Sequence, residues 1–429
     1  MSSNLVENQR PAKDLSPQSE TKSGQSGGVG RGWTVTLAGT GINLALGVLY
    51  TWSMFKEAIG REFGWKGEQL NDPYALCCLV FAFTMILAGR CQDKLGPRLT
   101  ATIGGLLVGG GLALISRTGS YTTWVLGFGV LVGAGIGFGY SSATPAALKW
   151  FGPSKTGLIA GVVVAGFGLA PAYLSPLTKF LLDSQGLRGA MLTYGVGAVV
   201  VVCGLAQLLV SPPQGRAAGE AGARGATPLA PAAGAPPGEM LRTPAFYLLW
   251  LAYFAGAGAG LMVISSISGM AKKSMGGAAF VAVALMALGN AAGRVTAGVL
   301  SDKIGRRGTL LLVLVCQALL MLAAIPVTGA SHAVPILTVV TATLIGFNYG
   351  ANLSLFPSFT KDFWGLKSFG LNYGLLFTAW GVGGLVLSRW QQVLTTHSGG
   401  NFASSFTAAS ALLMLGALLA FLIKPPKTV

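Results

Sequence analysis

Apolar runs recur along this chain at about 20 residues, the length that an α-helix needs to cross the hydrocarbon core of a bilayer. In lipid, backbone polar groups must be satisfied within the spanning structure, which a helix achieves. We therefore expect an all-α membrane protein. Its twelve predicted transmembrane helices lie at residues 34–55, 74–92, 99–116, 123–148, 156–180, 190–210, 244–270, 278–301, 308–328, 333–356, 368–388 and 403–423.

The composition supports this class of protein. Of the 429 residues, 52% are hydrophobic and only 10% are charged. Soluble domains carry about 25% charged residues, so a soluble chain with a large core would lack much of its solvated surface.

Polar segments divide the chain into two halves. Residues 1–31 form a polar tail without the apolar core of a signal peptide, so the first run should remain as a membrane helix. Residues 212–240 are rich in Pro, Ala and Gly, which predicts a linker. We expect six helices in residues 32–211, six in 241–424, and a short tail in 425–429.

Lysine and arginine predict the orientation. The formal net charge is +16, and with both termini inside, 19 of the 29 Lys and Arg residues fall on inner segments and 9 on outer ones. By the positive-inside rule, this predicts cytoplasmic termini in a multi-pass protein of the cell membrane, the inner one where there are two. The lipid bilayer explains the basic charge, so we expect no nucleic-acid partner.

No motif predicts a cofactor, a metal or an enzyme. The five cysteines lie in or beside apolar runs without a C-x-x-C spacing, which favours packing. The glycine clusters at 104–111 and 133–139 lack the strand and the Lys-Ser/Thr of a phosphate loop, and they favour close helix packing. The runs contain no nucleophile with a base, no metal cluster and no paired carboxylates.

The two halves are repeats of one sequence pattern. GRCQDKLGPR at 89–98 matches GVLSDKIGRR at 298–307, at an offset of 209 residues. The same alignment pairs aromatic residues of equivalent runs, Tyr140 with Tyr349 and, after four inserted residues, Phe167 with Trp380. Repeated halves of a transporter meet around a binding site near the midplane of the membrane. We therefore expect two six-helix, pseudo-symmetric halves.

One arginine, Arg294, lies inside an apolar run, eight residues before Asp302. At about 1.5 Å of helix per residue, it should lie about 12 Å inside the membrane, where a charge costs about 2.5–3.5 kcal/mol. No Asp or Glu is expected at this depth, so an anionic substrate is the predicted partner. The alternative is a brace that binds backbone carbonyls. A guanidinium can hold a carboxylate through two parallel hydrogen bonds.

The sequence resembles the major facilitator superfamily and, within it, the oxalate/formate antiporter family, which is related to the monocarboxylate transporters. The resemblance covers nearly all of the chain after residue 31. Six segments carry it: GVLYTW (47–52), GYSSATPAALKWF (139–151), GEMLRTPAFYLLW (238–250), GRVTAGVLSDKIGR (293–306), LFPSFTKDFWG (355–365) and NYGLLFTAW (372–380).

This resemblance implies the major facilitator fold and alternating-access transport of a small carboxylate anion, with the family's substrate-binding arginine at Arg294. It also implies that the repeated D-K-x-G loops, where glycine permits a tight bend, latch one state of the transport cycle. The predicted latch residues are Asp93, Gly96, Arg98, Asp302, Gly305 and Arg306.

Further side chains complete the predicted substrate site. Asn290 lies one helical turn from Arg294 and could donate to the substrate, orient Arg294 or bond to a neighbouring helix. Hydroxyls and ring edges of aromatic residues suit a small anion, although in membrane helices such residues more often serve packing or interface anchoring. The predicted aromatic cage consists of Tyr50, Trp52, Tyr140, Phe167, Tyr349 and Trp380.

Two departures from the family pattern bear on the substrate. Trp380 stands where oxalate-transporting members carry a lysine, which leaves one cation and favours a monocarboxylate of the formate, acetate, lactate or pyruvate type. Oxalate that is protonated once or paired with another cation is the alternative. Asn290 stands where proton-coupled monocarboxylate transporters carry an aspartate, which favours antiport or uniport over proton symport. A channel and a non-transporting sensor are remoter alternatives. Nothing in the fold requires more than a monomer.

Overall fold

The computed structural model describes residues 20–212, 234–276, 279–329, 334–398 and 401–426, in which the backbone is helical with short turns and no strand. Eleven helices in this part of the chain are long and apolar enough to cross a membrane. One of them, α7 (Thr156–Ala206), is broken at Gly186, where φ is 68°, and so supplies two spans. Large apolar side chains such as Leu87 and Phe180 are exposed on the outer surface, as expected for contact with lipid. Twelve spans in an all-α fold are therefore confirmed.

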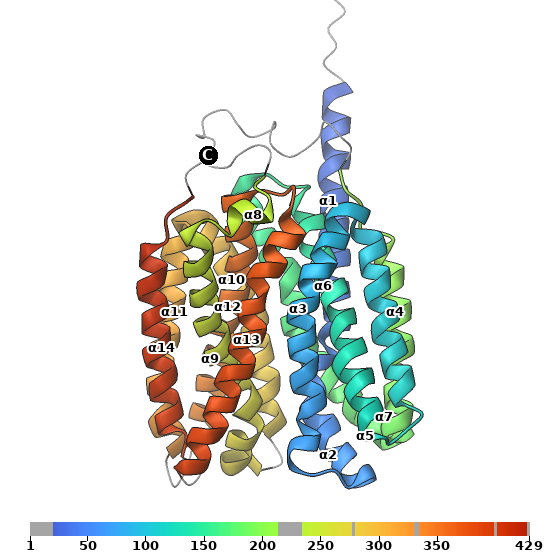
Figure 1. Cartoon of the computed structure of the whole chain (residues 1–429), viewed down its shortest axis with the longest axis vertical. Helices are drawn as coiled ribbons and strands as arrows, with labels where there is room; N and C mark the ends of the chain where they lie inside the picture. Colours follow the sequence, from blue (N-terminus) through green and yellow to red (C-terminus); the bar gives the residue numbers. More distant parts are fainter. Residues whose placement is uncertain (1–19, 213–233, 277–278, 330–333, 399–400, 427–429) are drawn as a thin grey trace, which may run out of the picture.

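Two bundles stand side by side, the N-terminal one on the right and the C-terminal one on the left of Figure 1. The first bundle contains α1 (Glu20–Leu46), η1 (Gly47–Thr51), α2 (Trp52–Phe63), η2 (Gly67–Leu70), α3 (Asp72–Leu95), α4 (Pro97–Ile115), α5 (Tyr121–Trp124), the π-helical η3 (Val125–Val132), α6 (Gly133–Leu148), η4 (Pro153–Lys155) and α7. The second contains α8 (Pro237–Met240), α9 (Pro244–Met275), α10 (Ala279–Ile304), α11 (Arg306–Gly329), α12 (Pro335–Trp364), α13 (Phe369–His397) and α14 (Ala403–Leu422).

The first predicted helix, 34–55, is interrupted in the structure. The chain passes from α1 into the 3₁₀ turn η1 at Gly47 and continues as α2. Gly47 packs so closely on α7 that an added Cβ would overlap the side chain of Ala170. The Thr51 hydroxyl donates to the carbonyl of Val48 at 2.7 Å within this tighter turn. Hydropathy does not report such a break, because the residues on both sides of it are apolar.

The helices α12 and α13 are longer than predicted. They end at Trp364 and His397, whereas the apolar runs end near 356 and 388. Hydropathy marks the hydrocarbon core, but a helix continues beyond it while its polar side chains find partners. The Lys361 ammonium, for example, donates to the Thr156 hydroxyl at 2.8 Å.

The predicted tails and linker lie largely outside the described residues. Residues 1–19, 213–233 and 427–429 are not described, whereas α1 already begins at Glu20, inside the predicted tail. The end of the linker is ordered against the second bundle, since the Ala235 amide donates to the carbonyl of Trp364 at 2.9 Å. The domain boundaries remain a prediction.

Two helix pairs make the largest contacts between the bundles, α3 with α13 and α7 with α10. In both pairs, glycines allow the backbones to touch. A Cβ on Gly298 would overlap the carbonyl oxygen of Gly157, and a Cβ on Gly89 would overlap that of Gly370. Gly89 and Gly298 are repeat equivalents at an offset of 209, and Gly157 and Gly370 at 213. The repeat in the sequence is therefore a repeat in the contacts between halves.

Candidate functional site

The aspartate of each repeated loop caps a helix of the opposite half. Asp93, near the end of α3, accepts hydrogen bonds from the backbone N–H groups of Gly370 and Leu371 at 3.0 and 2.9 Å. Asp302 of α10 accepts two such bonds, both at 2.9 Å, from the first turn of α7. The unpaired N–H groups and the positive dipole end of a helix N-terminus favour a carboxylate. We call these contacts the two latches, and the end of the molecule that carries them the latch end.

The second latch has additional ionic partners. Arg306 donates to Asp302 at 2.6 Å and to Asp362 at 2.8 Å, and it bonds the Ser301 hydroxyl at 2.6 Å. Its repeat equivalent in the first half is Pro97. The two latches are therefore alike in their helix caps but different in charge.

The remaining predicted latch residues form the turns. Gly96 and Gly305 adopt φ values of 88° and 87°, a region that favours glycine, and each lies between two consecutive helices. Arg98 is exposed, and none of the ion pairs in the described part of the chain includes it. The structure brings five of the six predicted residues into the turns and latches and leaves Arg98 outside them.

Arg294 is completely buried, with 0% of its surface exposed. Its Nε donates to Asn290 Oδ1 at 2.8 Å, and its Nη1 donates to the backbone carbonyl of Val164 on α7. Its Nη2 has no hydrogen-bond partner, and no ion pair among the described residues includes it. Of the five N–H donors of a guanidinium, one is held by Asn290 and one by Val164, and the Tyr50 hydroxyl lies close to the group. One contact expected of a structural brace, the bond to a backbone carbonyl, is therefore present, but the buried cation still has an Nη2 without a hydrogen-bond partner.

Glycines make room for this polar pair. An added Cβ on Gly168 of α7 would lie 2.9 Å from both Arg294 Nε and Asn290 Oδ1. One on Gly350 of α12 would lie 2.7 Å from Asn290 Oδ1. The sequence left three roles open for Asn290: donating to the substrate, orienting Arg294 or bonding a neighbouring helix. Its Oδ1 accepts from Arg294 Nε, which is the orienting contact.

A chain of hydrogen bonds links the two halves beside Arg294. The hydroxyls of Tyr50 and Tyr349 lie 3.1 Å apart, and Trp380 Nε1 donates to the Tyr349 hydroxyl at 2.9 Å. We call these three residues the hydroxyl bridge. The charge of Arg294 acts on the hydroxyls of both tyrosines, so the bridge and the cation belong to one site.

Other predicted aromatic residues pack onto this bridge. The Phe167 ring lies 5.1 Å from that of Tyr50 and 5.5 Å from that of Tyr140, both edge-on. The positive charge of Arg294 also acts electrostatically on the Tyr140 hydroxyl. Edge-on contacts are the favoured geometry of aromatic pairs. The structure therefore brings together seven of the eight predicted site residues.

Trp52 is the exception. Its ring packs 4.4 Å from that of Phe128, and its Nε1 donates to the carbonyl of Leu70 at 2.9 Å. These partners lie within the first bundle. Trp52 lines the outer cavity described below but is not in the cluster around Arg294.

Three site residues were missed by the sequence reasoning. Phe81 of α3 lies 5.2 Å from Trp380, and Phe377 of α13 lies 5.4 Å from Tyr140. Tyr253 of α9 lies where the charge of Arg294 reaches its hydroxyl. The repeat offset contained a signal for Phe81, which is the equivalent of Asn290, whereas Phe377 is the equivalent of Val164, a residue that the sequence did not mark. We find no comparable signal for Tyr253.

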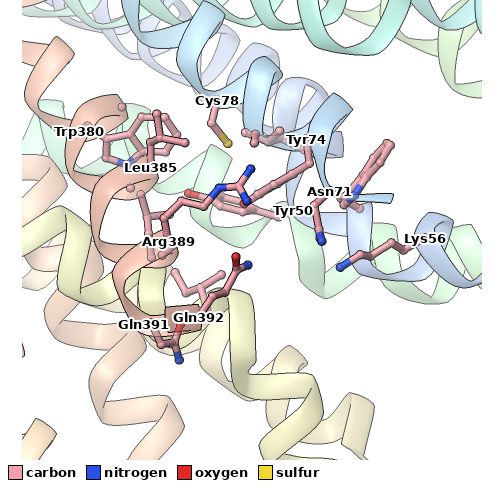
Figure 2. A pocket seen from close by; sticks show the side chains of 18 of the residues that line it. Tyr50, Lys56, Asn71, Tyr74, Cys78, Trp380, Leu385, Arg389, Gln391 and Gln392 are labelled. Carbon is pink, nitrogen blue, oxygen red and sulfur yellow. The ribbon is translucent and has the colours of Figure 1, made fainter. Parts of the chain in front are cut away.

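A cavity of about 440 Å³ opens at the end opposite the latches. Figure 2 shows Tyr50 and Trp380 on its inner side. Arg294 is not among the lining residues. The hydroxyl bridge therefore lies between this cavity and the cation, while the latch end is held together by Asp93 and Asp302.

The described residues contain no group of three or more His, Cys, Asp or Glu that could hold a metal ion. The five cysteines are free thiols. The amide oxygen of Asn290 and the carbonyl of Val164 accept hydrogen bonds from Arg294, so the groups that can donate to an anion here are the guanidinium itself and the tyrosine hydroxyls.

Comparison with known proteins decides the family. The profile of the Major Facilitator Superfamily matches residues 36–388 and 274–429, which together cover most of the chain. The chain belongs to the Major Facilitator Superfamily. Members of this superfamily are transporters, and alternating access between two halves fits the two bundles and the cross-half latches.

Relatives with assigned names match along most of this chain. It is 28% identical to the oxalate:formate antiporter of Oxalobacter formigenes over 407 residues, 94% of each protein. It is 27% identical to monocarboxylate transporter 13 of Rattus norvegicus over 394 residues, 90% of this chain and 87% of the relative. The uncharacterized MFS-type transporter YhjX of Escherichia coli K12 is 28% identical over 364 residues, 82% and 85% of the two chains.

Solved structures agree on the fold. FucP, a transporter of the same superfamily in the outward conformation, aligns with a TM-score of 0.65 at 16% identity, over 91% of this chain and 99% of its own. The proton:xylose symporter XylE aligns with a TM-score of 0.70 at 14% identity, over 92% and 96%. These alignments confirm the predicted fold.

Proposed function

We propose that this member of the superfamily carries small monocarboxylate anions and binds the carboxylate through Arg294. The observation that supports this most directly is a fully buried guanidinium whose Nη2 has no partner. An uncompensated charge in the membrane interior is a functional-site hypothesis by default. Named relatives that carry oxalate and formate or monocarboxylates support the same class of substrate.

The free N–H groups of Arg294 suit one carboxylate. With Nε held by Asn290 and one N–H of Nη1 held by Val164, the second N–H of Nη1 and those of Nη2 can give a carboxylate two parallel hydrogen bonds. The hydroxyls of Tyr50 and Tyr349 can exchange their mutual bond for bonds to the anion. Binding would therefore open the hydroxyl bridge and neutralise Arg294 together.

The single cation favours a monoanion. At the position where a second cation would pair with a dianion, Trp380 contributes an indole that donates to Tyr349. A dianion facing Arg294 alone would keep one negative charge in a desolvated site, which is costly. Asn290 cannot take up a proton, and we propose antiport or uniport on that basis.

The positive-inside rule gives the proposed orientation. The latch end would face the cytoplasm with both chain termini, in a multi-pass protein of the cell (inner) membrane. The cavity would then face outward, and this conformation would be closed to the cytoplasm. A monomer is sufficient, because the site forms within one chain, and the proposal involves no nucleic acid and no catalysis.

Flux measurements with purified protein in liposomes test this function. Labelled formate, acetate, lactate, pyruvate and oxalate would be offered with and without a carboxylate inside the vesicles. We expect saturable flux of one or more monoanions, faster than that of oxalate, with acceleration by internal anion if exchange is obligatory. If no carboxylate moved, the substrate class would be wrong.

Trp380→Lys is expected to admit the dianion. The new ammonium would lie beside Arg294 and supply the second charge, so oxalate flux should rise by about tenfold or more, equivalent to about 1.4 kcal/mol of added binding. Formate flux should fall, because a monoanion would neutralise only one of the two buried cations. The matched control is Trp380→Phe, which removes the donor to Tyr349 and adds no charge. An unchanged ratio of oxalate to formate flux in Trp380→Lys would rule out Trp380 as the selectivity residue.

The unequal latches predict unequal mutants. Asp302→Ala removes two helix caps and a direct ion-pair partner of Arg306, whereas Asp93→Ala removes two caps and a charge interaction with Lys149 that is not a direct ion pair. A lost cap costs about 1–2 kcal/mol, so Asp302→Ala should slow flux by about tenfold and Asp93→Ala by less. Initial rates at equal protein would be compared with Asp183→Ala, an exposed carboxylate in α7. A stronger defect in Asp93→Ala would contradict the assigned asymmetry.

A further inference from the structure

The outer cavity contains two cations, one from each bundle. Lys56 of α2 and Arg389 of α13 both line it, and Figure 2 shows their charged groups pointing into the cavity from opposite sides. Lys56 is half-buried, and 48% of the Arg389 side chain is exposed. Both are among the nine Lys and Arg residues counted on outer segments, and the fold brings them to one concave wall.

Neither cation is fully neutralised by the protein. Lys56 has no ion pair within the described residues, and burial lowers the pKa of its ammonium. Arg389 reaches one carboxylate in this part of the chain, that of Asp72, at 3.9 Å. The other oxygen of Asp72 accepts from the Tyr121 hydroxyl at 2.6 Å, and Asp72 does not line the cavity. Among the described residues that line the cavity, there are thus two positive charges and no carboxylate.

The rest of the wall is typical of a small-ligand site. Leucine and isoleucine side chains form apolar parts of it, and the amides of Asn71, Gln391 and Gln392 lie among them. A concave, mostly apolar site with a few converging polar groups is the usual form of a ligand pocket. Clefts with one sign of charge and low-dielectric walls also concentrate counter-ions.

We propose that this cavity is a second carboxylate-binding site, a vestibule in which the anion is held between Lys56 and Arg389 before the hydroxyl bridge opens. The proposal rests on the function proposed above and adds a site to it. Because the two cations belong to different bundles, the site is complete only while the bundles hold their present arrangement. It should therefore act on the step by which substrate enters or leaves through the cavity and leave the binding of substrate from the latch side unchanged.

Sided transport kinetics test the vestibule. In Lys56→Gln/Arg389→Gln, KM for a transported monocarboxylate should rise by about tenfold or more when substrate arrives from the cavity side, in line with the gain from electrostatic focusing. KM from the latch side and the maximal rate of entry from the cavity side should be unchanged, whereas the maximal rate of exit through the cavity should fall in proportion, because the ratio of maximal rate to KM is the same in both directions of a passive carrier. Intact cells and inverted membrane vesicles supply the two orientations. The matched control is Lys66→Gln/Arg117→Gln, which removes two exposed cations that do not line the cavity.

Thiol modification measures anion binding in the vestibule independently of transport. Ser388 lines the cavity, so Ser388→Cys places a reactive group there. Peptide mass spectrometry would measure modification at position 388 by a sulfonate-bearing and a trimethylammonium-bearing methanethiosulfonate. The anionic reagent should react faster than the cationic one, formate should slow it, and both effects should be lost in the double variant.

The two readouts separate this proposal from the first. If Arg294→Gln abolished flux while the double variant left the sided KM and the reagent preference unchanged, the vestibule would be wrong and the central site would stand. Reagent preference and formate protection that survived Arg294→Gln would support the vestibule independently of transport. Reagent preference without protection by formate would mean general attraction and no second site.

Discussion

Arg294→Gln is expected to reduce carboxylate flux at least about 30-fold, since losing one partner of a buried charge pair costs about 2–5 kcal/mol and each 1.4 kcal/mol is a factor of ten. Glutamine keeps a polar side chain, but it is shorter than arginine and supplies neither the charge nor the N–H groups of Nη1 and Nη2. Flux of labelled monocarboxylate into liposomes, with binding measured as thermal stabilisation by the same anion, checks this.

Two further variants show whether Arg294 binds or braces. Arg294→Lys keeps the charge and loses the planar fork, so it should retain binding that is weaker than in the parent. Arg307→Gln removes an arginine whose guanidinium lies 4.7 Å from the Phe421 ring, away from the site, and flux should persist. If folded Arg294→Gln protein transported normally, Arg294 would have a structural role through its contact with Val164, and the substrate would bind elsewhere.

Gly298→Val is expected to prevent closure of the latch end. The valine Cβ would overlap the carbonyl oxygen of Gly157, which is backbone and cannot move aside independently of α7. Overpacking of this kind costs about 1–3 kcal/mol. Moving α10 away from α7 relieves it, so the closed state should lose about tenfold or more of its population and flux should fall with it.

Spin labels at Lys94 and Lys303, exposed and repeat-equivalent positions in the two halves, would report the change. Their distance should lengthen in Gly298→Val and stay unchanged in Gly110→Val, where the added side chain meets open space on α4. A parent-like distance together with full flux in Gly298→Val would show that this contact does not limit closure.

The repeat alignment predicted which positions are structurally equivalent more reliably than it predicted what each residue does. It paired Gly89 with Gly298 and Asp93 with Asp302, and the structure gives each pair equivalent contacts across the halves. The alignment did not show that each aspartate binds the other half. Intramolecular symmetry fixes which positions are equivalent, but the helix that faces each of them depends on packing.

The surroundings of Arg294 illustrate the same limit. Its depth followed from its distance to the polar loop, because a helix has a fixed rise per residue. Its bond to Val164, 130 residues away, could not be derived in this way. Trp52 shows that closeness in sequence does not imply closeness in space. It follows Tyr50 by two residues but lies outside the cluster around Arg294.

By itself, the sequence determined the membrane class, the twelve spans, their duplication and the presence of one cation in mid-membrane. These are properties of local composition, and the bilayer imposes them on any segment of that length and polarity. Only the tertiary structure decided which helix each aspartate caps, that Asn290 holds Arg294, that Tyr50, Tyr349 and Trp380 form one bridge, and that Lys56 and Arg389 meet in a cavity. Those contacts join residues far apart in the chain, so they depend on how the helices pack and are absent from any single segment.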